Sequence, residues 1–387
     1  MGLEDRESLR VVQSALEGPR SEELIRHFYD TWFARDPSVG ALFPPDLTHQ
    51  RAAFTYALRW LFGEFIARRS AEPVAFLAQL GRDHRKYAVT EAQYTSMCQS
   101  LFLAVRAHLG DRFSAAVDDA TTEALTLIAG AMSGAAAADR QPAWWDGTVL
   151  DCARVSRDIA VVRVQLDEPM PYLAGQYVSV QVPQCPRRWR YLSPAVPSDP
   201  NGCIEFHVRA VPGGAVSPAV VSGTRPGDRW RLSSPHGGMH VDRDAGDVLM
   251  VAGSTGLAPL RALLMDLLQF GDNPRVHLFF GGRYPCELYD LPKLWQIAAC
   301  SPWLSVTPVS EFYGDPSWAS DYPDVQPPRG LHVRQTGWLP AVVSRYGGWS
   351  DRQILICGRP EMVTATRAAL IAKGAPAERI QHDPPAG

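Results

Sequence analysis

The sequence predicts three domains in series: an all-α first third, an antiparallel β-barrel, and an α/β domain with a doubly wound parallel sheet. Three observations support this prediction. Apolar residues in the first third recur three and four positions apart, which is the helical period. Short segments of alternating polarity follow, and then continuous apolar runs that end in glycine. We place the domains at residues 1–139, 140–243 and 244–387.

The helical period is clearest in two segments of the first third. The apolar residues that carry it are Leu24, Ile25, Phe28, Trp32, Phe54, Leu58, Leu61 and Phe65. Pro44-Pro45 and Gly110-Asp111 interrupt the pattern, because proline and glycine end helices. The stretch 135–142 (AAAADRQP) predicts a helix end followed by a linker.

Strands are predicted in the second and third domains, with different patterns. Alternating polarity between turn residues indicates half-buried antiparallel strands, here in the runs 148–150, 161–164, 177–182 and 204–208. Continuous apolar runs that lead into helical patterns are typical of buried parallel strands, here 248–252, 277–281 and 354–358.

The composition is that of an ordinary globular protein. The chain has 387 residues, of which 46% are hydrophobic, and a net charge of −3, which argues against nucleic acid as a partner. Its seven cysteines include no Cys-x-x-Cys pair, which fits a reducing compartment and argues against a disulfide framework or a zinc site. With no signal pattern and no apolar stretch of the ~20 residues that a membrane span needs, we expect a cytoplasmic protein without a stable membrane anchor.

His84 is the candidate metal ligand. A single histidine on a helix that faces an apolar pocket is how a protein holds haem iron from one side. Tyr94 is placed to tune this imidazole, and Tyr29 and Gln50 to donate hydrogen bonds to bound dioxygen. Each residue alone is more often structural, as a core or surface side chain. Their order and spacing together favour the haem interpretation.

Residues 22–94 resemble the globin domain of flavohaemoglobins. The resemblance lies in His27-Phe28-Tyr29-Asp30, Pro37, Leu42-Phe43, Gln50-Arg51-Ala52-Ala53-Phe54, His84 and Glu91-Ala92-Gln93-Tyr94. It implies haem b held by His84, O2 as a ligand, Phe43 on the haem face and Phe54 at a bulky distal position.

Two departures from that family concern the proximal side of the haem. The family's nitric oxide dioxygenases place a glutamate on the last globin helix, where it joins the equivalents of His84 and Tyr94. The corresponding position here is near Ala135, which carries no acid, and Asp83 stands where the family commonly has lysine. Without a charged partner, His84 is expected to be a weaker electron donor to iron.

The barrel segment carries residues suited to phosphate and flavin. Arg190-Tyr191-Leu192-Ser193 and Gly213-Gly214-Ala215-Val216-Ser217 resemble the flavin domain of the ferredoxin-NADP reductase superfamily. By this resemblance Arg190 pairs with the FAD pyrophosphate, Ser193 hydrogen-bonds the flavin ring, and amides of Gly214, Val216 and Ser217 cradle phosphate at a helix start. The alternative for Arg190 is a solvated basic strand. Leu192 replaces the family's flavin-stacking tyrosine. Because adjacent side chains on a strand point to opposite faces, Tyr191 cannot simply take its place, which leaves Trp189 or Tyr177 to cover the ring.

A glycine loop follows the first predicted parallel strand. Glycines there allow a tight turn and close approach to a pyrophosphate. Gly253-Ser254-Thr255-Gly256-Leu257-Ala258-Pro259 matches the superfamily's nicotinamide loop and implies NAD(P)H, with Gly253, Thr255, Gly256 and Pro259 as contacts. Arg283 either reads an adenosine phosphate or caps a turn. Cys357-Gly358 resembles a family stretch near the nicotinamide, although Cys357 alone also fits a small buried residue at a strand end.

The resemblance covers nearly the whole chain and is closest to the actinobacterial type II flavohaemoglobins. It implies an oxidoreductase that passes electrons through FAD to a haem that binds O2, with nitric oxide dioxygenase-like chemistry on nitric oxide or another small molecule. Leu192, and Pro385 in place of a shielding aromatic, leave an organic donor such as D-lactate open. A haem-based gas sensor with a degenerate reductase is a third interpretation. The choice of NADH or NADPH and the oligomeric state stay open.

Overall fold

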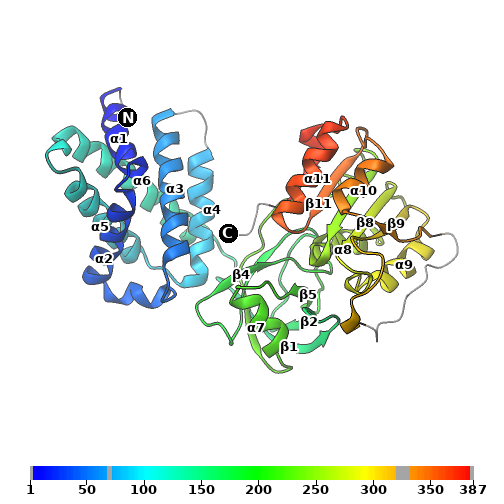
Figure 1. Ribbon diagram of the computed structural model, residues 1–387. Helices are drawn as coiled ribbons and strands as arrows, with labels where there is room; N and C mark the ends of the chain where they lie inside the picture. The colour runs from blue at the N-terminus through cyan, green and yellow to red at the C-terminus, as the bar shows by residue number, and fades with distance from the viewer. Residues whose placement is uncertain (1–2, 68–71, 320–330, 384–387) are drawn as a thin grey trace. The chain divides into compact units, whose positions relative to one another are not determined.

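The computed structural model describes residues 3–67, 72–319 and 331–383 and divides the chain between Trp144 and Trp145 into two compact units (Figure 1). The described part of the first unit is helical. Its α-helices are α1 (Leu3–Glu17), α2 (Ser21–Arg35), α3 (Thr48–Ala67), α4 (Glu72–His84), α5 (Glu91–Leu109) and α6 (Ala115–Ala138).

Helix ends in the first unit follow from local side-chain chemistry. Thr90 accepts a hydrogen bond from the Gln93 amide while the Gln93 side chain bonds back to Thr90, a capping box that starts α5. Ser114 accepts from the Val117 amide and starts α6. The helices enclose one apolar core whose members from α2 include Leu24 and Phe28, as their spacing predicted.

The second unit begins with a near-closed antiparallel barrel. Its strands are β1 (Trp145–Arg154), β2 (Ile159–Leu166), β3 (Val178–Gln181), β4 (Trp189–Leu192), β5 (Cys203–Arg209) and β6 (Arg229–Leu232), in the order β4-β3-β6-β1-β2-β5. A bridge between Pro194 and Phe206 joins the two edges. Helix α7 (Val216–Gly223) packs on the barrel core, which contains Phe206 and Trp230.

A parallel sheet with helices on both faces completes the second unit. Its strands are β7 (Val248–Gly253), β8 (Val276–Gly282), β9 (Leu304–Ser310), β10 (Gln335–Thr336), β11 (Gln353–Cys357) and β12 (Ile380–Gln381), in the order β10-β9-β8-β7-β11-β12. Helices α8 (Leu257–Leu267) and α9 (Leu291–Cys300) cover one face, and α10 (Leu339–Tyr346) and α11 (Pro360–Ala372) cover the other. The strand order reverses between β7 and β11, where ligands bind in such sheets.

The predicted order of folds is confirmed: a helical domain, an antiparallel barrel and a parallel α/β domain follow one another along the chain. None of the helices in the described ranges combines the length and the apolar character that a bilayer span requires.

Candidate functional site

A cavity of about 700 Å³ lies in the helical unit, within the usual range for cofactor pockets. Its walls are mostly aliphatic and aromatic, and His84 and Gln50 are its strongly polar members. The lining residues are Gln50, Ala52, Ala53, Phe54, Tyr56, Ala57, Leu58, Trp60, Leu61, Phe76, Leu77, Leu80, His84, Met97, Leu101, Leu125, Ile128 and Met132. Such a lining suits a flat apolar ring system with one axial ligand.

His84 is the last residue of α4, and its ring orientation is fixed by its own helix. Its Nδ1 lies 2.6 Å from the Leu80 carbonyl oxygen. Because a carbonyl only accepts, Nδ1 carries the proton and Nε2 keeps its lone pair. Burial lowers the pKa of His84, so the ring stays neutral. A neutral imidazole with a free Nε2 is the form that binds a metal, and His84 therefore fits a haem iron.

Tyr29 and Gln50 are paired in the same unit. A side-chain hydrogen bond joins Gln50 to the Tyr29 hydroxyl, and burial raises the pKa of that hydroxyl above its usual value. Phe54 lines the cavity, whereas Tyr29 and Phe43 lie behind its wall; the Tyr29 ring is 5.9 Å from Phe54 and 5.7 Å from Phe43. The structure thus brings Gln50, Phe54 and His84 to one cavity and places Tyr29 and Phe43 one layer further out.

Tyr94 lies beside His84, with 6.3 Å between the ring centroids. Its side chain is 4% exposed, and its hydroxyl has no hydrogen-bond partner among the described residues. Burial raises the pKa of Tyr94 to about 12. Tyr94 also lines a second cavity of about 600 Å³ with Ala136 and Ala137 of α6. Helix α6 therefore presents small side chains to the cavity that Tyr94 lines.

The predicted flavin residues lie on and after β4. In the register of β3 and β4, Arg190 pairs with Val180, Tyr191 with Ser179 and Leu192 with Val178. Leu192 packs against the barrel core, so Tyr191 points to the opposite face. There the Tyr191 ring meets Tyr177 edge-on, with 5.0 Å between centroids. Tyr177, one of the predicted covers of the flavin ring, therefore forms an aromatic pair with Tyr191 on this face.

The loop before α7, which is predicted to cradle phosphate, forms a tight turn. Gly213 has a φ of +78°, and the Gly214 amide donates to the Val211 carbonyl at 3.0 Å. Ser217 Oγ accepts from the Val211 amide at 3.1 Å, which holds the turn against the helix. Val216 is the first residue of α7, whose first-turn amides have no helical partners. The Gly214 amide is thus used within the turn, and the amides of Val216 and Ser217 are the predicted groups that remain to hold the FAD pyrophosphate.

The glycine loop sits at the point where the strand order reverses. A Cβ on Gly256 would lie 2.4 Å from the Cys357 carbonyl oxygen, so only glycine permits this approach of the loop to β11. Thr255 belongs to the short turn after β7, and Pro259 lies in the first turn of α8. Gly358, with a φ of +157°, follows directly after β11. The loop thus meets the Cys357-Gly358 stretch, so the structure brings these two predicted dinucleotide segments together.

Two further predicted positions can be placed. The Cys357 thiol is buried 3.5 Å from the sulfur of Met239, and burial raises its pKa well above the usual value. The Arg283 guanidinium is exposed and lies over the rings of Tyr284 and Phe312, 5.5 and 5.7 Å from their centroids. Asp383 is partly buried, which raises its pKa to about 6. Pro385 lies outside the described residues.

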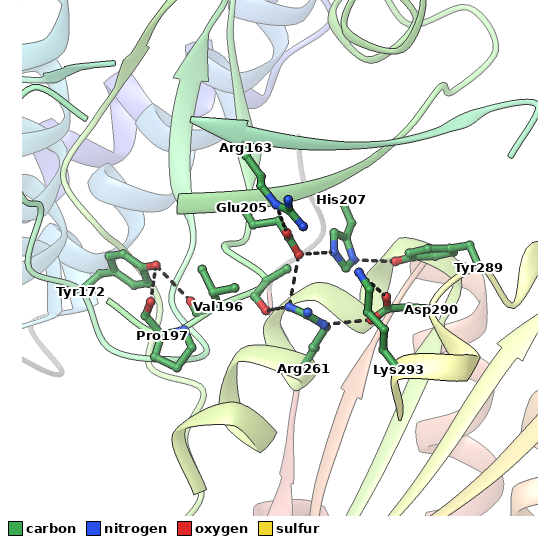
Figure 2. A network of polar contacts seen from close by, with 11 residues as sticks. Arg163, Tyr172, Val196, Pro197, Glu205, His207, Arg261, Tyr289, Asp290 and Lys293 are labelled. Carbon is green, nitrogen blue, oxygen red and sulfur yellow. Dashed lines mark hydrogen bonds and ion pairs between the residues drawn. The ribbon is translucent and has the colours of Figure 1, made fainter. Parts of the chain in front are cut away.

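A buried polar network joins the barrel to the α/β domain (Figure 2), and the sequence patterns did not indicate it. Glu205 on β5 contacts Arg163 at 2.8 Å, His207 at 3.1 Å and Arg261 of α8 at 3.3 Å. The His207 ring also bonds the Tyr289 hydroxyl at 2.8 Å. Burial acts to raise the pKa of Glu205, but these partners outweigh it and lower the pKa to about 2.

Arg261 extends this network toward both predicted binding segments. Its side chain pairs with Asp290 at 2.9 Å and donates to the Ala195 carbonyl at 2.6 Å. Ala195 lies two residues after Ser193, and Arg261 lies two residues after Pro259 of the glycine loop. The network therefore fixes the flavin segment and the glycine loop within one compact unit.

Three family models match successive parts of the chain. They are Globin over residues 26–132, Oxidoreductase FAD-binding domain over residues 146–241, and Oxidoreductase NAD-binding domain over residues 250–368. The chain therefore joins a globin to a flavin and nicotinamide oxidoreductase module.

Curated relatives match a little over half of the chain. The reductase component DmpP of phenol 2-monooxygenase from Pseudomonas sp. is 33% identical over 227 residues, which are 58% of this chain and 61% of that protein. The reductase subunit of aromatic O-demethylase from Amycolatopsis sp. is 33% identical over 229 residues, which are 56% of this chain and 62% of that protein. The chain thus spans about three fifths of the length of these relatives.

Solved structures extend the similarity to the whole chain. A flavohaemoglobin from Malassezia yamatoensis with bound FAD and haem superposes with a TM-score of 0.73 at 16% identity, over 97% of this chain and 98% of that one. The Amycolatopsis cytochrome P450 reductase GcoB gives 0.53 at 29% identity, over 62% of this chain and 68% of that one. In domain content and order, the chain is a flavohaemoglobin-like fusion of globin, FAD-binding and NAD-binding domains.

Proposed function

We propose that this chain is a flavohaem oxidoreductase that takes electrons from NAD(P)H and uses them for oxygen chemistry in the globin, with nitric oxide as the favoured co-substrate. The observation that carries the proposal is the apolar cavity bounded by His84 and Gln50, in a chain that also holds a reductase module. The relatives named as reductase components of oxygenase systems support electron delivery by the second unit.

In this proposal the side chains of the globin bind and orient. When bound, the haem and the FAD supply oxygen binding and the conversion of a two-electron hydride donor into single electrons. His84 presents Nε2 because Leu80 holds the proton on Nδ1. Gln50 is the polar side chain that lines the cavity together with His84, and Tyr29, which stays protonated outside the lining, positions Gln50 through their hydrogen bond. The apolar lining excludes water, which strengthens these polar contacts.

A second donor class is favoured by one observation on β4. Leu192 packs into the barrel core, so that position supplies no aromatic cover for a flavin. When a different side chain stacks on the flavin ring, the reduction potential of the flavin shifts and a different class of electron donor can reach it. An organic donor such as D-lactate, as in the type II subgroup, is therefore the alternative to NAD(P)H.

The test is anaerobic absorbance of the full chain loaded with haem and FAD, with NADH, NADPH and D-lactate added in turn. We expect NADH or NADPH to bleach the flavin and shift the Soret band; a response to D-lactate alone selects the second donor class. If no donor changes either band, the electron-transfer proposal is wrong.

The haem assignment has its own test. We expect His84→Ala to abolish stable haem retention, because the axial bond is lost. The matched control is His27→Ala, which alters an exposed histidine of α2 in the same unit. A His84→Ala chain with a full haem complement and an unchanged spectrum would refute the assignment.

A further inference from the structure

Arg209 occupies a position between the two predicted phosphate loops. It is the last residue of β5, four residues before Gly213 of the flavin loop. Its side chain is only 16% exposed, although it belongs to the barrel surface by sequence pattern. The α/β domain covers it, and its guanidinium reaches into the glycine loop.

Every nitrogen of the Arg209 guanidinium is engaged. Nε donates to Asp158 of the barrel at 2.7 Å. The two Nη atoms donate to the two carboxylate oxygens of Glu287 at 3.2 and 3.3 Å. Nη1 also donates to Ser254 Oγ at 3.0 Å. The planar fork of arginine suits this bidentate pairing, which a lysine cannot reproduce.

Ser254 is the strained residue of the glycine loop. Its φ is +53°, a left-handed conformation that costs a non-glycine residue free energy and persists only where surrounding contacts impose it. On one side the loop is pinned by Gly256, which lies against the Cys357 carbonyl. On the other side, the Ser254 side chain is held by its hydrogen bond from Arg209.

The contact with Arg209 leaves the hydroxyl proton of Ser254 available for a second hydrogen bond. Arginine only donates, so Ser254 Oγ uses a lone pair toward Arg209 and keeps its own proton. That proton can serve a dinucleotide bound at the loop, where hydroxyl and amide donors meet phosphate or carboxamide oxygens.

We propose that Arg209 is a positioning residue for the nicotinamide dinucleotide: through Ser254 it holds the glycine loop in its binding conformation. The inference rests on the proposed function, because it concerns NAD(P)H at this loop. It predicts that the barrel, which holds the flavin, also sets the affinity for the second cofactor.

The test measures NADH and NADPH binding by titration, and their oxidation with ferricyanide as acceptor, in the full FAD-loaded chain. Ser254→Ala still bears the conformational cost of a positive φ but loses the hydroxyl that meets Arg209, and we expect Kd and KM to rise about tenfold with a smaller change in kcat. Ser254→Gly removes the strain, so we expect a rise of only about two- to threefold. FAD content and flavin reduction by dithionite should not change.

Arg209→Gln tests the other partner of the contact. We expect a rise in Kd at least as large as for Ser254→Ala, and no further rise when the two changes are combined, because they remove one interaction. The matched control is Arg229→Gln, which removes a barrel arginine that pairs with Asp167 and lies outside the network at Glu205. If Arg209→Gln does not fold, the Kd and KM values of the two Ser254 variants test the proposal without it.

The outcomes separate the inference from the proposed function. A wild-type chain that binds and oxidises NADH or NADPH, with Ser254→Ala unchanged in Kd and KM, overturns the inference alone. A purely structural role for Arg209 would lower FAD content or thermal stability and leave KM unmoved, which also overturns it. A wild-type chain that binds neither dinucleotide overturns both.

Discussion

Gly81 is the position where a single methyl group should damage the globin most. It lies in α4 one turn before His84, where α4 crosses α6. A Cβ at residue 81 would lie 2.1 Å from the Met132 carbonyl oxygen and 2.7 Å from the Met132 Cα. Because the obstacle is backbone, a rotamer change cannot relieve it. The two helices would have to separate by about 1 Å to restore ordinary contact.

Two opposing effects decide whether Gly81→Ala raises or lowers the free energy of unfolding. Alanine is favoured over glycine in a helix by about 1 kcal/mol. Forcing atoms into a packed contact costs about 1–3 kcal/mol, and a backbone clash belongs at the upper end. We therefore expect a net destabilisation of about 2 kcal/mol, which for a unit of this size is a fall in Tm of roughly 5–8 °C. Haem affinity should fall too, because His84 moves with α4.

The assay is thermal loss of the Soret band in the haem-loaded chain, with haem affinity measured by titration of the apoprotein. Gly130→Ala is the matched control, since nothing lies within 4 Å of its added Cβ in α6. We expect that control to gain about 0.5–1 kcal/mol and to bind haem normally. If Gly81→Ala behaves like Gly130→Ala, the reasoning from the helix crossing is refuted.

Three further predictions follow from buried groups. Tyr94→Phe removes a buried hydroxyl without a described partner, so the free energy of unfolding should stay equal or rise by about 1 kcal/mol; a loss beyond about 1 kcal/mol in denaturant melts would reveal a hidden partner. Glu205, whose pKa is lowered to about 2, stabilises the fold by roughly 3 kcal/mol above pH 4.5, and this is lost as pH falls toward 2. The stability gap between Glu205→Gln and wild type should therefore be largest near neutral pH and narrow in acid; a gap that is constant with pH would contradict the assignment. Gly256→Ala places a methyl 2.4 Å from the Cys357 carbonyl, and we expect NADH binding to be lost while FAD is retained, as measured by titration and flavin content.

The sequence predicted the fold class because each domain shows a different period. Helical spacing, alternation and continuous apolar runs are local signals that tertiary contacts did not overrule here. Strand β9 was missed for a physical reason: Pro308 lies inside it, and proline argues against a central strand. Strand β12, with only two residues, leaves no periodic signal.

The candidate site was partly predictable. His84 and Gly256 could be predicted as site residues because few roles suit a histidine or a glycine at those positions. The network around Glu205 and His207 could not, because alternation along β5 assigns both residues to the solvent face. That face is covered by the α/β domain, and the covering contacts come from Arg261 and Tyr289, far along the chain. Burial of this kind is set by domain packing, which no local pattern records.

The cysteines have a practical consequence. Only Cys300, at the end of α9, is exposed among the seven. Burial raises the pKa of Cys98 to about 11 and that of Cys357 well above its usual value, which keeps these thiols protonated and slow to react. A maleimide fluorophore should therefore attach first at Cys300 and give a reporter on the α/β domain without engineering a cysteine-free background.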